Sequence, residues 1–188
     1  MTEPCIIVLA SGRGERYRAS GGQTHKLQAQ LGSQTVLQHT VQAARATGLL
    51  VHVEDAGHPG MGDSIAAAVR RTPDASAWLI LAGDLPLVLP HTILQIAQAP
   101  LEYAVVRPNF EGQHGHPVRF AQTCHQDLLQ LSGDHGAAPL VKRLGVHAIA
   151  VDDLGCVTDI DTVADLERAQ VLWAERQKLR ARIPKDPI

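Results

Sequence analysis

The 188-residue sequence predicts an α/β protein. Short apolar runs alternate with segments whose apolar residues recur at helical spacing, and this alternation favours strands and helices that follow one another along the chain. The run Trp78–Ala82 (WLILA) is apolar throughout, as expected for a central parallel strand buried on both faces. A glycine-rich loop follows the first apolar run, which is how an α/β protein builds an anion site at a strand end.

Composition narrows the classes of function. Apolar residues make up 45% of the chain, enough for one domain with an ordinary core. A net charge of −2 and an aromatic content of 3% argue against a nucleic-acid surface and against base-stacking platforms. The apolar runs are too short to span a bilayer, and no basic segment with a signal-like core opens the chain. Cys5, Cys124 and Cys156 are widely spaced, as free thiols in a reducing compartment would be, so we expect a cytoplasmic protein that contacts neither nucleic acid nor membrane.

Local signals define the elements of the amino-terminal half. Thr35 and Gln38 form a capping-box pattern ahead of apolar residues at helical spacing, so a helix should run from there toward Gly48. Asp63 is expected to cap a second helix over 64–71, which a proline then ends. Strands are expected at 5–10, 50–54 and 78–82.

The carboxy-terminal half continues the alternation. Thr162 is expected to cap a long final helix, with Asp165 in the capping-box position. The chain is therefore expected to form a single domain over 1–180, and the proline-interrupted segment 181–188 should fray. Ahead of the final helix, the pattern predicts helices at 91–99, 124–131 and 139–144 and strands at 103–107, 118–120 and 146–151.

The loop after the first strand has the composition of a phosphate site, with four glycines, three arginines and a lysine. It matches neither common glycine motif. Tyr17 replaces the third glycine of a dinucleotide-binding turn, and His25 rather than glycine precedes Lys26, unlike in a P-loop. Two readings remain: a solvated turn with surface cations, or a loop whose backbone at 11–14 approaches a nucleotide while Arg16 and Lys26 neutralise its phosphates.

Candidate metal-binding carboxylates stand at two places in the chain, after a predicted strand and before the final helix. Asp84 follows the WLILA run in a Gly-Asp-Leu-Pro turn, at the strand end where open α/β sheets bind their ligands. It either shapes this turn or holds Mg²⁺, which takes one or two carboxylates together with phosphate oxygens. Asp159 and Asp161 precede the final helix on opposite sides of an extended segment, and one of them is a candidate second metal ligand.

Two further glycine-punctuated segments are candidates for ligand contact. Residues 60–64 (GMGDS) lead into a helix, whose N-terminus can bind a polar ligand edge such as a base or ribose. Residues 112–118 (GQHGHPV) contain a His-x-His pair. No cysteine or third histidine stands nearby at zinc-ligand spacing, so ordinary loop histidines are the favoured interpretation.

Taken together, these segments resemble a known family. From Ile6 to Leu166, they are similar to the molybdenum-cofactor cytidylyltransferase branch of the MobA-like nucleotidyltransferases. The segments that carry this resemblance are, in chain order, LASGRGERY…HK, GMGDSI, LAGDLP, GQHGHPVRF, LSGDHGAAPLV and DIDTVADL. The resemblance implies a three-layer α/β/α Rossmann-like nucleotidyltransferase fold with a mostly parallel mixed sheet. It also implies Mg²⁺-dependent transfer of CMP from CTP onto the phosphate of molybdopterin, a phosphorylated pterin, with release of pyrophosphate.

The resemblance assigns roles to individual residues. Arg16 and Lys26 correspond to the phosphate-binding catalytic cations of the family, and Asp84 corresponds to its catalytic metal aspartate. Asp161 resembles a second metal ligand. The nucleotide-binding counterparts are Leu9, Ala10, Ser11, Gly12, Gly14, Lys26, Gly62 and Ser64, and the acceptor-binding counterparts are Gly115 and His116.

The chain departs from the family pattern between Gly48 and Gly60, where a single strand stands in place of a larger section of sheet. Leu85 does not distinguish cytosine from guanine, whereas the GHPV turn and the DIDT segment favour the cytidylyl branch. Two alternatives stay open. One is an enzyme that uses GTP or another NTP with a different phosphorylated acceptor. The other is a non-catalytic protein that escorts a nucleotide or the finished cofactor to a molybdenum hydroxylase.

Overall fold

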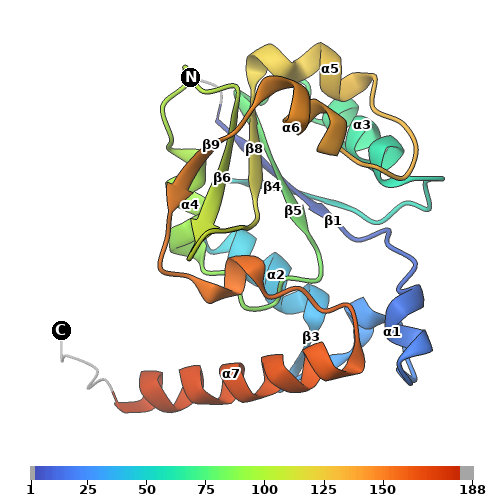
Figure 1. The fold of residues 1–188 in the computed structure, drawn as a ribbon, viewed down its shortest axis with the longest axis vertical. Coiled ribbons are helices and arrows are strands. Elements are labelled where there is room, and N and C mark those ends of the chain that lie inside the picture. Colours follow the sequence, from blue (N-terminus) through green and yellow to red (C-terminus); the bar gives the residue numbers. More distant parts are fainter. Residues whose placement is uncertain (1–2, 183–188) are drawn as a thin grey trace.

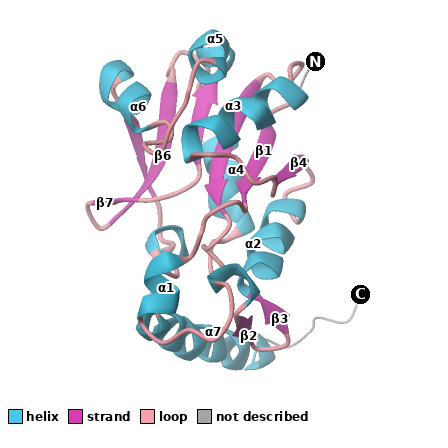
Figure 2. Ribbon diagram, turned by 90° about the vertical axis from the view of Figure 1, so that its right-hand side faces the viewer, coloured by secondary structure: helices cyan, strands magenta, loops and turns pink. Residues whose placement is uncertain are grey.

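The computed structural model describes residues 3–182, which fold around one seven-stranded mixed sheet with helices on both faces (Figures 1 and 2). The strand order is β4-β1-β5-β8-β6-β7, and β9 pairs with β6 outside this path. Strands β4, β1 and β5 are parallel neighbours, β8 runs antiparallel between β5 and β6, and β9 is parallel to β6. The architecture is the Rossmann-like α/β arrangement that the sequence predicts.

The strands are short, and those in the middle of the main sheet are mostly buried. Those of the main sheet are β1 (Cys5–Leu9), β4 (Leu50–Glu54), β5 (Ala77–Ala82), β6 (Val105–Phe110), β7 (Gln113–His114), β8 (Val118–Ala121) and β9 (His147–Ala150). A separate two-stranded hairpin consists of β2 (Gln30–Leu31) and β3 (Gln34–Thr35).

Helices fill most of the connections between strands. They are α1 (Glu15–Ala19), α2 (Val36–Arg45), α3 (Met61–Arg71), α4 (Pro90–Ala97), α5 (His125–Leu129), α6 (Ala138–Leu144) and α7 (Val163–Arg182). Three 3₁₀ turns are η1 (Lys26–Gln28), η2 (Gln122–Cys124) and η3 (Leu154–Val157). No helix within the described residues is both long and apolar enough to cross a membrane.

The side chains of β1 point alternately into two layers of the core. Cys5 and Ile7 pack on one side with α3, α5 and α6, whereas Ile6 and Val8 pack on the other side with α2 and α4. Successive side chains of a strand point to opposite faces of a sheet, so a continuous apolar run is required where both faces are covered. Trp78, which is fully buried in β5, meets the same requirement.

A third apolar cluster attaches the carboxy-terminal helix to the rest. Trp173 of α7 packs with Leu31 of the hairpin, Tyr17 of α1 and Ile160, which precedes α7. In Figures 1 and 2, α7 runs along one end of the molecule, beneath α1 and the hairpin. This cluster therefore joins the start of the chain to the segment that carries Asp161.

Both expected capping boxes are confirmed. The Thr35 side chain accepts from the backbone N–H of Gln38 at 3.2 Å, and the Gln38 side chain accepts from the N–H of Thr35 at 2.8 Å. At α7 the Thr162 hydroxyl accepts from the Asp165 N–H at 3.2 Å, and the Asp165 carboxylate accepts from the Thr162 N–H at 2.7 Å. The helix extends to Arg182, into the segment expected to fray, and residues 183–188 lie outside the described part of the chain.

The expected cap at Asp63 is wrong. Helix α3 begins at Met61 with Gly60 as its N-cap, and Asp63 lies in the first turn, where its carboxylate accepts from the Gly133 N–H at 2.9 Å. The reason is tertiary. A Cβ on Gly60 would stand 2.4 Å from the Gly133 backbone, and one on Gly62 would stand 2.7 Å from the Ser132 backbone. These glycines let the distant loop contact the start of the helix directly.

The strand register decides where the loops meet. Leu9 pairs with Ala82 at the last positions of β1 and β5, so the glycine loop and the Asp84 turn leave the sheet side by side. Asp84 is also joined to the segment before α7, because the Ile160 N–H donates to the Asp84 carbonyl at 3.0 Å. Segments that are far apart in the sequence therefore meet at one edge of the sheet.

Gly155 provides a test of this arrangement. A Cβ at this position would stand 1.9 Å from the Leu87 carbonyl oxygen, a backbone atom that cannot move aside as a flexible side chain can. We expect Gly155→Ala to lower the free energy of unfolding by about 1–3 kcal/mol, the usual effect of overpacking, in urea titrations. Gly57→Ala is the control, because nothing lies within 4 Å of a Cβ there. Equal effects of the two substitutions would contradict the packing explanation.

Candidate active site

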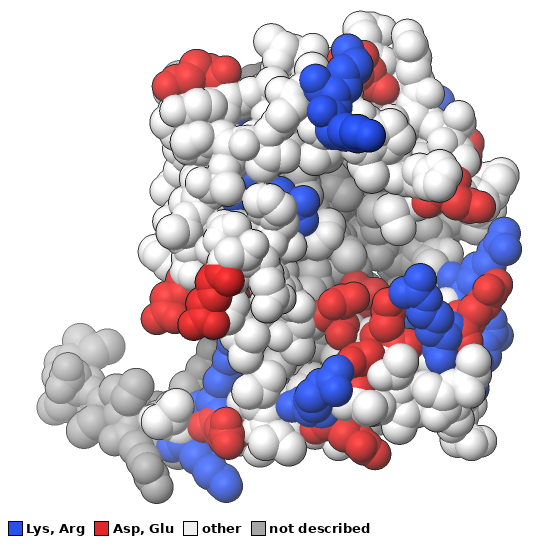
Figure 3. Space-filling model, in the orientation of Figure 1, with Lys and Arg blue, Asp and Glu red and all other residues white. Residues whose placement is uncertain are grey.

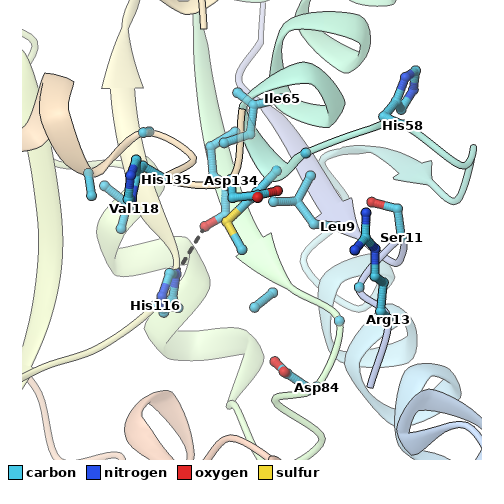
Figure 4. A pocket seen from close by; sticks show the side chains of 18 of the residues that line it. Leu9, Ser11, Arg13, His58, Ile65, Asp84, His116, Val118, Asp134 and His135 are labelled. Carbon is cyan, nitrogen blue, oxygen red and sulfur yellow. Dashed lines mark hydrogen bonds between the residues drawn. The ribbon is translucent and has the colours of Figure 1, made fainter. Parts of the chain in front are cut away.

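A cleft of about 830 Å³ opens at the carboxyl ends of β1 and β5. In Figure 4, Ser11 and Arg13 lie on one side of this cleft, His116 and Val118 lie across from them, and Asp84 lies between the two sides. Figure 3 shows the same region as a hollow, with acidic and basic side chains gathered along its lower edge. Because ligands of open α/β sheets bind at this edge, the cleft is the candidate active site.

The glycine loop forms one wall and is held by its own hydrogen bonds. Gly14 has a φ of 63° and stands at the N-cap of α1. Ser11 and Ser64 share a hydrogen bond of 2.9 Å between their hydroxyls, and a ring nitrogen of His25 lies 2.6 Å from the Gly12 carbonyl oxygen. The Ala10 N–H donates to the carbonyl of Glu54 at 2.8 Å. These contacts fix the backbone of residues 11–14, the segment expected to face a nucleotide.

Tyr17 explains why this loop matches no dinucleotide-binding motif. It stands in place of the third glycine, and its side chain is buried in the cluster beneath the loop. A Cβ on Gly22 would lie 2.2 Å from the Tyr17 ring. The loop is therefore packed around an aromatic side chain from α1, rather than opening a long helix onto the ligand.

Lys26 lies between two carboxylates that come from different parts of the chain. Its Nζ donates to Asp84 Oδ2 at 2.6 Å and to Asp161 Oδ1 at 2.7 Å. Arg16 donates to the other oxygen of Asp161 at 3.0 Å. The Lys26 and Asp84 side chains are only 12% and 15% exposed, so their interaction is shielded from solvent far more than an ordinary surface ion pair.

The protonation states follow from this geometry. Burial disfavours the charged form of Lys26, but the Asp84 and Asp161 carboxylates outweigh it and raise the pKa of Lys26. Burial likewise acts to raise the pKa of Asp161, but Lys26 and Arg16 outweigh it and hold that pKa below its usual value. Lys26 and Asp161 are therefore both charged near neutral pH.

One carboxylate oxygen of this cluster remains for a cation. Asp84 Oδ1 is buried and has no hydrogen-bond partner within the described residues, although buried carboxylate oxygens usually find one. No group of three or more His, Cys, Asp or Glu side chains in this part of the chain is arranged to hold a metal ion alone. Mg²⁺ is commonly held by one or two carboxylates plus substrate phosphates, so Asp84 and Asp161 fit that requirement.

The opposite wall carries His116. Its side chain is half-buried, with Nδ1 3.5 Å from the Ile80 carbonyl oxygen, a contact drawn in Figure 4. Burial, followed by the positive charge of Arg107, lowers the pKa of His116. The ring is therefore neutral near pH 7. It is a polar group in the wall and not a cation.

The structure brings most of the predicted site residues to one cleft. Those that line it are Leu9, Ser11, Gly12, Gly14, Arg16, Lys26, Asp84, His116 and Asp161. Ala10, Gly62, Ser64 and Gly115 lie outside the lining; Gly62 packs on Ser132, and a Cβ on Gly115 would meet Cys156 Sγ at 2.5 Å. Of the two aspartates before α7, Asp161 joins the Lys26 cluster, whereas Asp159 is exposed.

Sequence reasoning missed two groups beside the cleft. Glu54, at the end of β4, is fully buried and accepts from the Ala56 N–H at 3.2 Å, while ring nitrogens of His52 and His58 each lie 3.3 Å from its carboxylate. Burial alone would raise the pKa of Glu54, but these hydrogen bonds lower it. Arg107, on the opposite wall, was interpreted only as the end of a strand. Its charge within a buried strand is the signal that could have identified it.

Comparisons with known proteins agree with this fold. Residues 42–149 match the MobA-like NTP transferase domain model. Among curated proteins, the purine catabolism protein PucB of Bacillus subtilis (strain 168) is 35% identical over 118 residues. That alignment takes in 60% of this chain and 57% of PucB, so the chain matches little more than half of the length of that relative.

Solved structures are similar over more of the chain. Rv0371c from Mycobacterium tuberculosis H37Rv has a TM-score of 0.76 at 27% identity, covering 90% of this chain and 98% of that one. A second structure of Rv0371c is a complex with manganese, with a TM-score of 0.72 at 25% identity over 90% and 98% of the two chains. Mth528, a nucleotidyl transferase from Methanothermobacter, shares the fold with a TM-score of 0.78 at 20% identity over 94% and 100%. The family model covers more than half of the sequence, and the chain belongs to the MobA-like NTP transferase domain family.

Proposed function

We propose that this protein is a Mg²⁺-dependent nucleotidyltransferase that moves CMP from CTP onto the phosphate of molybdopterin and releases pyrophosphate. The observation that carries the proposal is the position of Lys26. Its ammonium group bridges Asp84 and Asp161 at 2.6 Å and 2.7 Å, beside a glycine loop and within a cleft. Nucleotidyl transfer needs these three parts together: a backbone that approaches phosphates, cations that neutralise them, and carboxylates for a metal.

The reaction requires little covalent chemistry from the protein. An oxygen of the acceptor phosphate attacks the α-phosphorus in line while pyrophosphate leaves, so positioning and charge neutralisation set the rate. Lys26 and Arg16 would stabilise negative charge on the departing pyrophosphate. Ser11, Gly12 and Gly14 would orient the triphosphate. Bound Mg²⁺, held by Asp84 and Asp161, would supply Lewis-acid stabilisation of the phosphate oxygens.

The choice of CTP and molybdopterin rests on the sequence motifs. The GHPV turn, the GD-x-GA segment and the DIDT segment resemble the cytidylyl branch of the family. The manganese complex of Rv0371c supports the use of a divalent cation, although it does not identify the ion that this chain uses. The finished dinucleotide cofactor would then pass to a client enzyme, such as a molybdenum hydroxylase.

Pyrophosphate release tests the proposal directly. The purified protein is incubated with Mg²⁺, molybdopterin and one of CTP, GTP, ATP or UTP, and released pyrophosphate is measured. We expect CTP to give the highest kcat/KM. Preference for another NTP would contradict the cytidylyl assignment and leave the enzyme class intact. Absence of turnover with every NTP and with a range of phosphorylated acceptors would favour the non-catalytic escort instead.

The first substitution tests the metal carboxylate. Asp84→Asn keeps the shape of the side chain and removes its charge, so we expect kcat to fall by about 100-fold or more, because several kcal/mol of transition-state stabilisation depends on the metal. Asp74→Asn is the matched control, because Asp74 is exposed and precedes the first residue of β5, whereas Asp84 follows the last. An unchanged kcat in Asp84→Asn would remove Asp84 from the proposed metal site.

The second substitution separates the two roles of Lys26. Lys26→Met retains the aliphatic stem and removes the ammonium group, so we expect kcat/KM to fall by about 100-fold or more through lost stabilisation of phosphate charge. The same change leaves Asp84 and Asp161 without the cation between them. We therefore expect Mg²⁺ alone to raise the melting temperature of Lys26→Met more than that of the wild type. A variant that is less stable but fully active would assign Lys26 a structural role only.

A further inference from the structure

Arg107 is a cation on the wall of the cleft that faces the glycine loop. It stands in β6, is partly buried, and lines the same cleft as Lys26 and Asp84. Its Nε donates to the Gly115 carbonyl at 3.2 Å. Among the side chains that the structure describes, neither of its Nη atoms has a hydrogen-bond partner, and no carboxylate lies within 4.0 Å of its guanidinium group. The backbone contact therefore fixes one edge of the guanidinium group and leaves the other without a protein partner.

The positive charge of Arg107 is not compensated by the surrounding protein. Burial lowers the pKa of Arg107, which is the expected effect of removing a cation from water. The nearby Cys156 thiol supplies no negative charge at neutral pH, because burial and then the charge of Asp153 raise its pKa to about 11. His116 responds to the same uncompensated charge and is held neutral beside it. A partly buried cation without a counter-ion is a favourable place for an anionic ligand.

The other cationic side chains of the cleft differ from Arg107. Lys26 and Arg16 are paired with aspartates, and Arg13 lies 3.9 Å from Glu15. Lys142 also lines the cleft, but it is exposed to solvent. Among the described residues, Arg107 thus combines burial with the absence of a carboxylate partner, and it lies on the wall away from the loop expected to hold the triphosphate.

Apolar side chains line the cleft together with this cation. Val118 and Phe120 of β8, Ile80 of β5 and Val141 of α6 line the same cleft. An apolar surface beside a single guanidinium group fits a small organic molecule with one anionic group better than a free polyphosphate, which would require several cations. A planar guanidinium binds two oxygens of a phosphate at once, which gives both charge neutralisation and orientation.

We propose that Arg107 binds the phosphate monoester of the acceptor substrate and thereby selects a phosphorylated acceptor. The inference rests on the proposed function, because it assumes that the triphosphate occupies the glycine loop. In this arrangement the acceptor phosphate enters from the β6 and β8 wall, and His116 lines the same cleft. Arg107 is then a specificity-determining residue for the acceptor and has little effect on nucleotide binding.

Calorimetric titration with inorganic phosphate, the simplest probe of such a site, tests the inference. The wild type is first saturated with Mg²⁺ and α,β-methylene CTP, which blocks the nucleotide site, and phosphate is then titrated. We expect Arg107→Met to weaken phosphate binding by about tenfold or more, since hydrogen bonds to charged groups are among the strongest in proteins. The affinity for the nucleotide analogue should stay within about twofold of the wild type. Lys142→Met is the matched control and should have a smaller effect on phosphate binding.

The outcomes separate the two proposals. If the analogue fails to bind the wild type, the proposed function is contradicted. The phosphate titration, repeated without nucleotide, then still compares Arg107→Met with Lys142→Met. If the analogue binds but Arg107→Met binds phosphate as tightly as the wild type, or loses no more than Lys142→Met, the inference is overturned. If Arg107→Met does not fold, Arg107→Lys replaces it: this variant keeps the charge but lacks the planar fork, and phosphate affinity equal to that of the wild type would also overturn the inference.

Discussion

The site depends on one shielded electrostatic interaction, the contact of the Lys26 ammonium group with Asp84 and Asp161. The two aspartates are 58 and 135 residues from Lys26 along the chain, so the contact exists only when the whole sheet edge is assembled. The register of β1 and β5 brings the glycine loop to the Asp84 turn, and the hydrogen bond from Ile160 to Asp84 brings the segment of Asp161. Arg16 adds a second cation, which balances the charge of the cluster without saturating Asp84 Oδ1.

This cluster stabilises the fold over a defined range of pH. The pKa of Lys26 is raised, so its contribution is complete below the unfolded value of about 10.4 and is lost as the pH rises through the folded value. The pKa of Asp161 is lowered, so its contribution is present above the unfolded value of about 3.9 and is lost as the pH falls through the folded value. Both contributions are therefore present at neutral pH. The arrangement of carboxylates that a metal and a triphosphate would need is assembled under those conditions.

Local signals in the sequence predicted more of the fold than long-range packing did. The Thr35 and Thr162 caps involve residues three positions apart, and both were predicted because the pattern contains both partners. The start of α3 was not predicted, because glycine is required at positions 60 and 62 by contact with a loop some seventy residues away in the sequence. The cleft followed from the strand ends, which chain order and alternation define. The proposed role of Arg107 could not be predicted in this way, because it depends on the absence of a carboxylate partner, and no pattern in the linear sequence shows that absence.

The structure separates glycines that internal packing requires from a glycine that packing does not require, and the sequence alone does not make this distinction. At Gly62 and Gly115 a Cβ would collide with the protein itself, so internal packing accounts for glycine there. At Gly12 a Cβ would meet nothing within 4 Å, and φ lies outside the positive range that favours glycine. Neither packing nor backbone conformation then requires glycine at this position. The proposed approach of a nucleotide to the bare backbone would account for glycine at this position, in a loop that lines the cleft together with Lys26 and Asp84.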